Sequence, residues 1–490
     1  MRRSVPLLAF ILLWTFTAVA QQSLIKRLDG STITPAEVDS TVSRLMKAAE
    51  VPGVAVAIIN DGQIAYLKAY GFRDTESKLP LTPGSVMTAA SFTKSAFADM
   101  VMQIASEGRL DLDKPIYEYL PKPLPEYPAY SDLAGDNRYK RITARMLLDH
   151  SSGFPNWRSL EPDRKLKIHF EPGTRFAYSG EGIVLLQLVV ETITGEPLEQ
   201  LMDERVFRPL GMTRTSMAWQ ERFDTDYANG YDEYGRSLGP QKRKTADAAG
   251  SMQTTVGDFA RLIQAVLLGK GLEKQFLQLM LSPQIRIYSK HEFPTLAGDT
   301  THENDTIRLS YGLGWGLYFS PYGEAFFKEG HDDGWRNYAV GFVRPKSGIV
   351  IMTNSGNGEG IFKELLETLL KDTSTPIEWE GYTPYNLLPP RPPLPKHTAV
   401  HVDSAVLDKY VGKYKVPGGT AVILAIQRAG DHLTVQENDE PKQDLLPESE
   451  TQFFSTVADD VYRFEMDERG HVTTMILHTD GQDIRIPRQQ

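Results

Sequence analysis

The chain has 490 residues, of which 41% are hydrophobic and 10% aromatic. This composition is typical of a folded protein, and the length is too great for one ordinary core. The net charge is −10 with acidic and basic residues mixed, which argues against a nucleic-acid-binding surface, since that needs a basic patch. The chain has no cysteine, so disulfides, thiolate nucleophiles, thiolate metal sites and a lipid-modified N-terminal cysteine are excluded.

Residues 1–20 have the pattern of a secretory signal peptide. Arg2 and Arg3 form the charged start, residues 5–19 are largely apolar, and Ala18-Val19-Ala20 is a small-x-small cleavage signature. An uncleaved membrane anchor is the alternative, but the apolar run is short for a full span. The sequence therefore predicts a periplasmic or secreted protein with no membrane span after signal cleavage.

The next elements predict strands at both ends of a domain with helices between them. Residues 53–72 read as a β-hairpin, because Asp61-Gly62 separates two apolar, β-rich runs. A helix is expected after Ser91, with apolar residues at helical spacing until Gly108. Further helices are expected over 183–193, 198–207, 259–268 and 361–370, and strands over 325–328, 338–343 and 349–352.

This order predicts an α+β fold, in which an antiparallel sheet built from both ends of the domain is flanked by helices. We expect that domain to cover residues 31–376. A proline-rich linker, residues 377–400, contains the run Pro389-Pro390-Arg391-Pro392-Pro393-Leu394-Pro395. Short alternating runs then predict a small all-β domain over residues 401–490.

Ser91-Phe92-Thr93-Lys94 is the candidate catalytic motif. Positions i and i+3 share one helix face, so the lysine amine can reach the serine hydroxyl. Burial and the positive end of a helix both favour a neutral lysine, which can then act as the base that serine needs. The alternative is a helix N-cap followed by a solvated lysine. Ser23-Leu24-Ile25-Lys26 has the same form, so the motif is weak by itself.

Four more segments place polar residues in turns or at a strand end. They are Leu147-Leu148-Asp149-His150-Ser151-Ser152-Gly153, Gly173-Thr174-Arg175-Phe176-Ala177-Tyr178-Ser179-Gly180, Tyr311-Gly312-Leu313-Gly314-Trp315 and Gly330-His331-Asp332-Asp333-Gly334. We expect His150 to hold a loop near the site, and Trp315 and Trp335 to be wall or core residues.

Together with Ser91 and Lys94, these segments resemble the serine β-lactamase and penicillin-binding protein superfamily. The similarity covers roughly residues 35–370 and is greatest to class C enzymes, family VIII esterases, and D-aminopeptidase-like and DD-carboxypeptidase-like members. The resemblance implies a β-lactamase/transpeptidase-like fold and an acyl-enzyme mechanism.

The resemblance also implies a role for each candidate residue. Ser91 would be the acylated nucleophile, Lys94 its proton acceptor, and Tyr178 the residue that relays the proton to the leaving group. His331 falls where β-lactamases have Lys-Thr-Gly and where many esterase-like members have histidine. The backbone N–H groups of Ser91 and Gly334 would form the oxyanion hole.

Two departures from the family pattern concern substrate binding. Gly180 stands at the substrate-binding position where β-lactamases usually have asparagine, so that amide is missing. Asp333 stands where the third motif has glycine, and Asp332 adds a second carboxylate. Both weaken the case for efficient antibiotic hydrolysis. A metal site at His331-Asp332-Asp333 is not expected, because three consecutive residues cannot all face one ion, and no cofactor is predicted.

The leading prediction is an exported serine hydrolase acting on small esters or on D-residue-containing amides and peptides. The alternatives are a β-lactamase or DD-carboxypeptidase, and a penicillin-binding or sensor module without turnover. Charged Lys94 and His331 would each lower the pKa of Tyr178, so activity should fall as the pH drops through the histidine range. The C-terminal domain carries no readable chemical motif; in similar proteins such a module limits access to the cleft. The sequence leaves the oligomeric state open.

Overall fold

The computed structural model describes residues 24–393, 396–417, 422–438, 442–479 and 481–489. The predicted signal peptide lies outside these residues, as does Ser23 of the second Ser-x-x-Lys pattern. Within the described ranges, no helix combines the length and the apolar character needed to cross a membrane.

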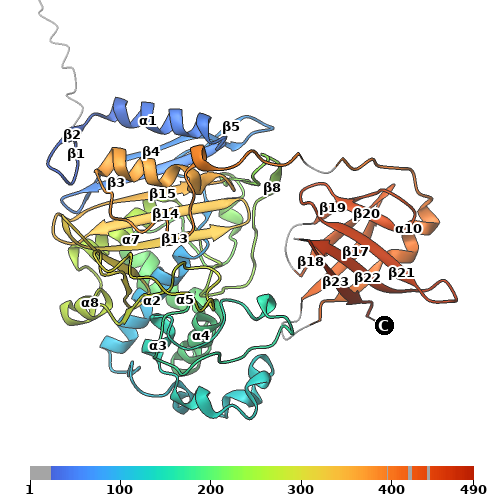
Figure 1. The fold of residues 1–490 in the computed structure, drawn as a ribbon, viewed down its shortest axis with the longest axis horizontal. Coiled ribbons are helices and arrows are strands. Elements are labelled where there is room, and N and C mark those ends of the chain that lie inside the picture. The colour runs from blue at the N-terminus through green and yellow to red at the C-terminus, as the bar shows by residue number, and fades with distance from the viewer. Residues whose placement is uncertain (1–23, 394–395, 418–421, 439–441, 480, 490) are drawn as a thin grey trace, which may run out of the picture.

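A nine-stranded antiparallel sheet forms the centre of the larger domain (Figure 1). Its order is β10-β11-β12-β13-β14-β15-β3-β4-β5. The bounds are β3 Gly53–Asn60, β4 Gln63–Asp74, β5 Leu79–Pro80, β10 Ile285–Arg286, β11 Ser310–Tyr311, β12 Gly316–Ser320, β13 Gly323–Asp332, β14 Trp335–Phe342 and β15 Ser347–Thr353. The two ends of the domain meet where β15 pairs with β3, with Ile351 opposite Val56. The predicted hairpin of β3 and β4 is confirmed.

Helices cover both faces of this sheet, because its central strands are buried on both sides. Figure 1 shows α1 on one side and α2, α4 and α5 on the other. The first face carries α1 Pro35–Ala48 and α9 Phe362–Leu365; the second carries α2 Phe92–Ser106, α3 Ala144–Leu148, α4 Gly180–Thr194, α5 Leu198–Met202, α6 Arg208–Leu210, α7 Val256–Leu268 and α8 Lys274–Met280. The predicted α+β class is therefore confirmed.

Two predicted helices change character along their length. The helix expected over 198–207 is α5 followed by a π-helical turn, Asp203–Phe207, and the one over 361–370 is α9 followed by a π turn, Leu366–Leu370. Short 3₁₀ turns occupy Ile116–Tyr119, Leu124–Glu126, Pro128–Leu133, Asn137–Arg141, Arg158–Leu160, Glu221–Phe223, Gly358–Ile361 and Tyr385–Leu387. Three small sheets pair β1 Ile25–Lys26 with β2 Thr32–Ile33, β6 Met87–Thr88 with β9 Gln253–Thr254, and β7 Gly230–Tyr231 with β8 Ser237–Gly239.

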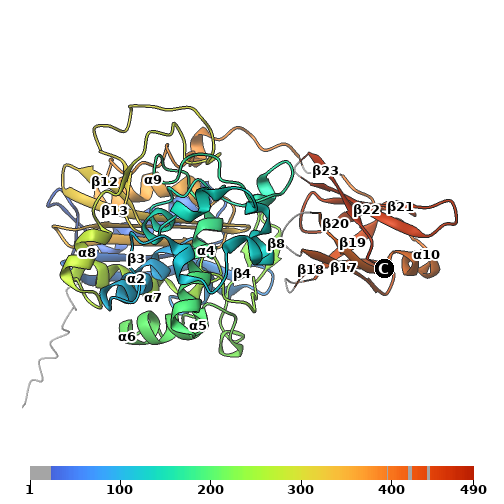
Figure 2. The ribbon, with the colours of Figure 1, turned by 90° about the horizontal axis from the view of Figure 1, so that it is seen from below.

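The C-terminal domain is an eight-stranded antiparallel meander with its own apolar core (Figure 2). Its strands are β16 Gly412–Lys415, β17 Ile423–Ala429, β18 His432–Glu437, β19 Gln443–Pro447, β20 Gln452–Ser455, β21 Val461–Met466, β22 Val472–Thr479 and β23 Gln482–Pro487. Tyr414 forms a bridge with Arg488, so the first and last strands nearly close a barrel. One helix, α10 Ser404–Tyr410, precedes the predicted all-β fold.

Candidate active site

Ser91 lies at the N-cap of α2, where the chain enters the helix in a strained conformation. Ala90 before it has a φ of 49°, a left-handed conformation that is costly for a residue with a Cβ. The Ser91 side chain makes no capping hydrogen bond with α2. The backbone strain at Ala90 therefore accompanies a serine hydroxyl that is available for chemistry rather than committed to the helix.

Lys94 lies one turn further along α2 with its amine directed at this hydroxyl. Its Nζ is 3.0 Å from the Ser91 Oγ and donates to the Ala249 carbonyl oxygen at 2.6 Å. Burial, followed by the positive charge of Lys328, lowers the pKa of Lys94 to about 7, while Glu329 acts in the opposite direction. A large fraction of Lys94 is thus neutral near pH 7, as a general base requires.

Tyr178 lies in the turn before α4, with its ring centroid 5.1 Å from the Lys94 Nζ. Burial, followed by the negative charge of Glu329, raises the pKa of Tyr178 well above its ordinary value, and contact with Ser91 acts weakly in the other direction. The direction of this shift is therefore opposite to the lowering expected from Lys94 and His331, because desolvation and the Glu329 carboxylate make the largest contributions. Tyr178 holds its proton at neutral pH.

Lys328 on β13 is a residue of this site that the sequence analysis missed. Its side chain is fully buried, and its Nζ donates to the Tyr178 hydroxyl at 3.0 Å and contacts the Glu329 carboxylate. A signal for it was present, since Lys328-Glu329-Gly330 has the spacing of the Lys-Thr-Gly motif. The predicted position of this motif, at His331, is three residues too far along the chain, because Lys328 is the residue that contacts Tyr178.

His331 consequently does not hold the place predicted for its side chain. Residues an odd number apart on a strand face opposite sides of the sheet, so when Lys328 points to the site, His331 points away. The His331 ring is half exposed, with its Nδ1 3.7 Å from a Glu359 carboxylate oxygen. Partial burial and the Arg336 guanidinium lower its pKa to about 4.

Gly334 lies in the hairpin turn between β13 and β14, with a φ of 75°. A Cβ built there would come within 2.7 Å of the Tyr231 nitrogen, so its neighbours belong to β7. The part of β13 that approaches Ser91 is Gly330, where a Cβ would lie 2.6 Å from the Ala89 carbonyl oxygen. The predicted position of the oxyanion donor, Gly334, therefore also lies too far along the chain, because its neighbours are in β7.

Gly180 is the first residue of α4, and the indole of Trp157 lies directly against it. A Cβ at Gly180 would lie 2.5 Å from this ring, so the position has no room for a side chain. Arg158 and Glu181 form a buried two-point ion pair that holds the Trp157 loop on α4. Trp157 thus fills the space beside the position where the family has its asparagine.

A buried acidic cluster lies beside Lys328. One carboxylate oxygen from each of Glu292, Glu329 and Glu380 lies within 4.8 Å of the others, and within the described part of the chain this is the only such group with metal-ligand spacing. Burial, then repulsion from Glu329, raises the pKa of both Glu292 and Glu380 well above the usual range. Lys328 already supplies a cation here, so protons on the other two carboxyls complete the charge balance.

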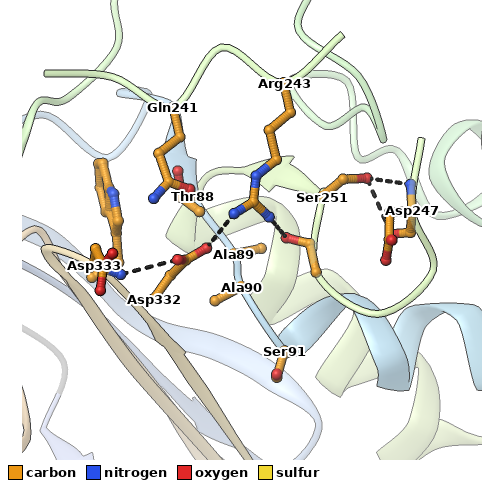
Figure 3. Close-up of polar contacts among 12 residues, drawn as sticks. Thr88, Ala89, Ala90, Ser91, Gln241, Arg243, Asp247, Ser251, Asp332 and Asp333 are labelled. Atoms are coloured by element: carbon orange, nitrogen blue, oxygen red, sulfur yellow. Dashed lines mark hydrogen bonds and ion pairs between the residues drawn. The ribbon is translucent and has the colours of Figure 1, made fainter. Parts of the chain in front are cut away.

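Arg243 crosses above the nucleophile. Its Nη2 lies 2.9 Å from the Asp332 carboxylate, and its Nη1 donates to the Gly250 carbonyl oxygen at 3.1 Å. Figure 3 shows Arg243 reaching between Asp332 and the loop of Asp247 and Ser251, with Ser91 beneath. The extra carboxylate noted at Asp332 is therefore partnered at the end of β13.

His150 supports the turn that carries Tyr178, whereas Lys26 lies away from the candidate active site. The His150 Nδ1 accepts the Ser179 N–H at 3.2 Å, and its ring packs 4.4 Å from that of Tyr178. This agrees with the expected structural role. Lys26 of the second Ser-x-x-Lys pattern lies on β1, where it is exposed and paired with Asp61 at 2.6 Å.

Comparison with known proteins identifies the family of the larger domain. Residues 38–371 match the family model described as Beta-lactamase. The chain belongs to the β-lactamase family. Members of this family are typically serine hydrolases. Residues 396–488 match a second model, described as a domain of unknown function (DUF3471).

Relatives of this β-lactamase-family chain carry several names. Penicillin-binding protein 4* of Bacillus subtilis is 25% identical over 86% of this chain and 92% of its own length. A β-lactamase of Pseudomonas fluorescens is 26% identical over 58% and 74%. A putative D-alanyl-D-alanine carboxypeptidase of Escherichia coli is 31% identical over 34% and 43%.

A solved structure shares the fold over nearly the whole chain. The octameric penicillin-binding protein homologue from Pyrococcus abyssi aligns with a TM-score of 0.57 and 21% identity, covering 92% of this chain and 99% of its own. At this identity the similarity establishes the architecture alone.

Proposed function

We propose that this protein is a serine hydrolase that works through an acyl-enzyme on Ser91, with small esters or D-residue-containing amides and peptides as substrates. One observation carries the proposal. The Lys94 Nζ is 3.0 Å from the Ser91 Oγ, in a setting that lowers the pKa of Lys94 to about 7. The alternative, a helix N-cap followed by a solvated lysine, does not explain why the Lys94 amine is buried beside the Ser91 hydroxyl.

In the proposed acylation step, the Ser91 oxygen attacks the substrate carbonyl carbon and its proton passes to neutral Lys94. Tyr178 then donates its proton to the departing alkoxide or amine and is reprotonated from the Lys94 ammonium. Its raised pKa supports this role, because the tyrosine enters the step protonated. In deacylation, water attacks the acyl carbon, gives a proton to Lys94, and that proton returns to Ser91.

The oxyanion would be held by the Ser91 N–H and by a backbone donor on β13. β12 pairs with β13 only as far as Phe327, so the edge beyond it is unpaired by β12. Asp332 and Trp335 close the hairpin as partners, and backbone donors alternate between the two edges of a strand. This alternation directs the His331 N–H to the free edge. We therefore assign the second donor to the His331 backbone in place of Gly334.

A β-lactamase or DD-carboxypeptidase is the second candidate, because Lys328-Glu329-Gly330 supplies the third family motif beside Tyr178. Substrates of that class carry a carboxylate. Glu329 already contacts Lys328 and balances the positive charge that would otherwise attract this carboxylate. This arrangement favours neutral esters and amides over carboxylate-bearing substrates.

The test is acylation followed by intact mass measurement. A fluorophosphonate should add its mass to the wild-type protein at Ser91 and leave Ser91→Ala unmodified. A penicillin adduct that decays would indicate turnover of the second candidate, and a lasting adduct would indicate a binding module. Equal hydrolysis of a chromogenic ester by wild type and Ser91→Ala would refute the assignment of the nucleophile.

We also propose that the protein is exported, because residues 1–20 have signal-peptide character. N-terminal sequencing of the mature protein tests this. A first residue of Gln21 supports export with cleavage, and an intact Met1 in a cytoplasmic fraction contradicts it.

A further inference from the structure

A cleft of about 1050 Å³ lies between the β-lactamase-family domain and the C-terminal domain. Trp157, Arg243 and Asp332 belong to its wall on the side of the larger domain. Small-molecule sites usually occupy about 300–1,000 Å³. The cleft therefore has room for much more than the reacting group of a small ester.

Trp157 connects the cleft with the surroundings of the candidate nucleophile, whereas Ser91 and Lys94 do not themselves line the cleft. The ring of Trp157 lies 5.9 Å from the Lys94 Nζ, which in turn lies 3.0 Å from the Ser91 Oγ. A substituent on a carbonyl group at Ser91 would consequently pass Trp157 and enter the cleft.

The opposite wall is the mouth of the C-terminal barrel. Tyr462 of β21 is the partner of Leu477 of β22, and Leu477 is the partner of Ile484 of β23, so these three side chains form one layer across adjacent strands. The apolar residues that line the cleft from this domain are Val416, Val422, Leu424, Val435, Val457, Tyr462, Leu477, Ile484 and Ile486. Most of them belong to the domain core or pack on it.

The far end of the barrel is closed. Leu407 and Tyr410 of α10 are fully buried there, and the Tyr410 ring stacks on that of Phe464 at 4.3 Å. Figures 1 and 2 both show α10 at the end away from the larger domain. An eight-stranded barrel has just enough interior for side chains or for one small ligand. Here the interior is filled by side chains, and the end opposite the cleft is closed. The apolar mouth at the cleft is formed by the partly exposed Val422, Leu477 and Ile484.

Polar contacts hold this open end over the cleft. Arg236 of the larger domain pairs with Asp459 of the barrel at 3.2 Å, and the Tyr234 hydroxyl donates at 3.1 Å to the carbonyl oxygen of Pro392 in the linker that leads to the barrel. Charged residues at the barrel rim, among them Glu437, Lys442 and Asp460, surround the apolar layer. The side chains that line the cleft are charged at the rim and apolar at the barrel mouth. This arrangement suits an uncharged hydrocarbon group.

We propose that the open end of the barrel binds the apolar part of the substrate, so that the preferred substrates are esters or amides carrying a medium or long hydrocarbon chain. This inference rests on the proposed hydrolase function and deepens it. It assigns to the C-terminal domain a direct role in substrate selection, in place of the general restriction of access expected from the sequence.

The kinetic test uses the full chain and a series of p-nitrophenyl esters from acetyl to decanoyl. Each methylene that packs against the apolar mouth should raise kcat/KM by up to about fourfold. Ile484→Trp fills the layer at the mouth and should lower the decanoyl-to-acetyl ratio of kcat/KM at least tenfold. Ile423→Trp is the matched control, because this residue lies in the same domain outside the cleft lining. It should leave the ratio unchanged.

A binding test separates this inference from the proposed chemistry. In a Ser91→Ala background, 1-decanol should displace 1-anilinonaphthalene-8-sulfonate from the protein, and Ile484→Trp should weaken this displacement at least tenfold while Ile423→Trp does not. If esters are hydrolysed but both tryptophan variants keep the wild-type chain-length ratio and cooperative unfolding, the inference is wrong. If no ester is hydrolysed, the proposed function fails, and decanol displacement alone decides whether the barrel binds hydrocarbon.

Discussion

The two buried lysines beside Tyr178 lie in pockets of opposite electrostatic character. Lys94 donates to two uncharged acceptors, the Ser91 hydroxyl and the Ala249 carbonyl, and its pKa is lowered to about 7. Lys328 lies against the carboxylate of Glu329, which balances its charge. The comparison shows how one residue type takes two roles. Burial without an adjacent counter-charge prepares the Lys94 amine to accept a proton, whereas Lys328 is paired with a carboxylate and donates to the Tyr178 hydroxyl.

Among these predictions, the largest effect on activity is expected when Lys94, the lysine without a counter-charge, is replaced. Lys94→Met keeps the length and burial of the side chain but removes the base, so kcat on an ester should fall by about 10²–10⁴-fold, the usual range for one general base. Lys26→Met is the matched control, because Lys26 stands in the same sequence pattern but is exposed. Steady-state kinetics at pH 8 measure both. Activity of Lys94→Met within tenfold of wild type would contradict the assignment.

The pH dependence of the wild-type enzyme follows from the same amine. Only neutral Lys94 accepts the serine proton, so kcat/KM should fall as the pH drops through about 7, by about tenfold per unit on the acid limb. The predicted direction matches the sequence-based expectation, but the responsible group changes from a histidine to Lys94. His331→Ala should therefore leave the midpoint in place. A profile that is flat from pH 5 to 9 would count against this mechanism.

Substitutions on the Lys328 side should move that midpoint in opposite directions. The positive charge of Lys328 lowers the pKa of Lys94, and the negative charge of Glu329 raises it. Lys328→Met should therefore shift the acid limb of kcat/KM to higher pH, with a loss of about 10²-fold in rate from the missing donor at Tyr178. Glu329→Gln should shift it to lower pH. Unchanged midpoints in both variants would show that the two pockets are not coupled, and shifts in the same direction would contradict the signs assigned to the two charges.

The fold was largely predictable because its signals are local. Asp61-Gly62 between two apolar runs determines the first hairpin, and these strands then pair with the last ones of the domain. The π-helical turns after α5 and α9 had no signal, since apolar spacing does not distinguish one helical hydrogen-bond pattern from another over a single turn.

The site residues on a helix could be predicted from their spacing. The site residue on β13 could not, because the register of the strand determines which side chains face the site. Ser91 and Lys94 follow from the i, i+3 spacing on α2. On β13, by contrast, a shift of three residues exchanges the face that points inward, and the contact of Lys328 with Tyr178 shows that Lys328 and not His331 faces the site. Glu292 and Glu380 were beyond reach, because they come from separate loops that the fold alone brings to Lys328.

The smallest predicted effect is a change in stability at the contact of Gly180 with Trp157, which separates the two lysines from the cleft. Gly180→Ala places a Cβ 2.5 Å from the Trp157 ring and should lower the free energy of unfolding by about 1–3 kcal/mol, the usual cost of overpacking. Gly257→Ala is a suitable control, because its Cβ finds ordinary contacts. Trp157→Leu should relieve the penalty in the double variant, so denaturant titration of wild type, the Gly180→Ala and Trp157→Leu single variants and their double variant gives the coupling directly. Additive effects of Gly180→Ala and Trp157→Leu would show that the indole does not define this wall.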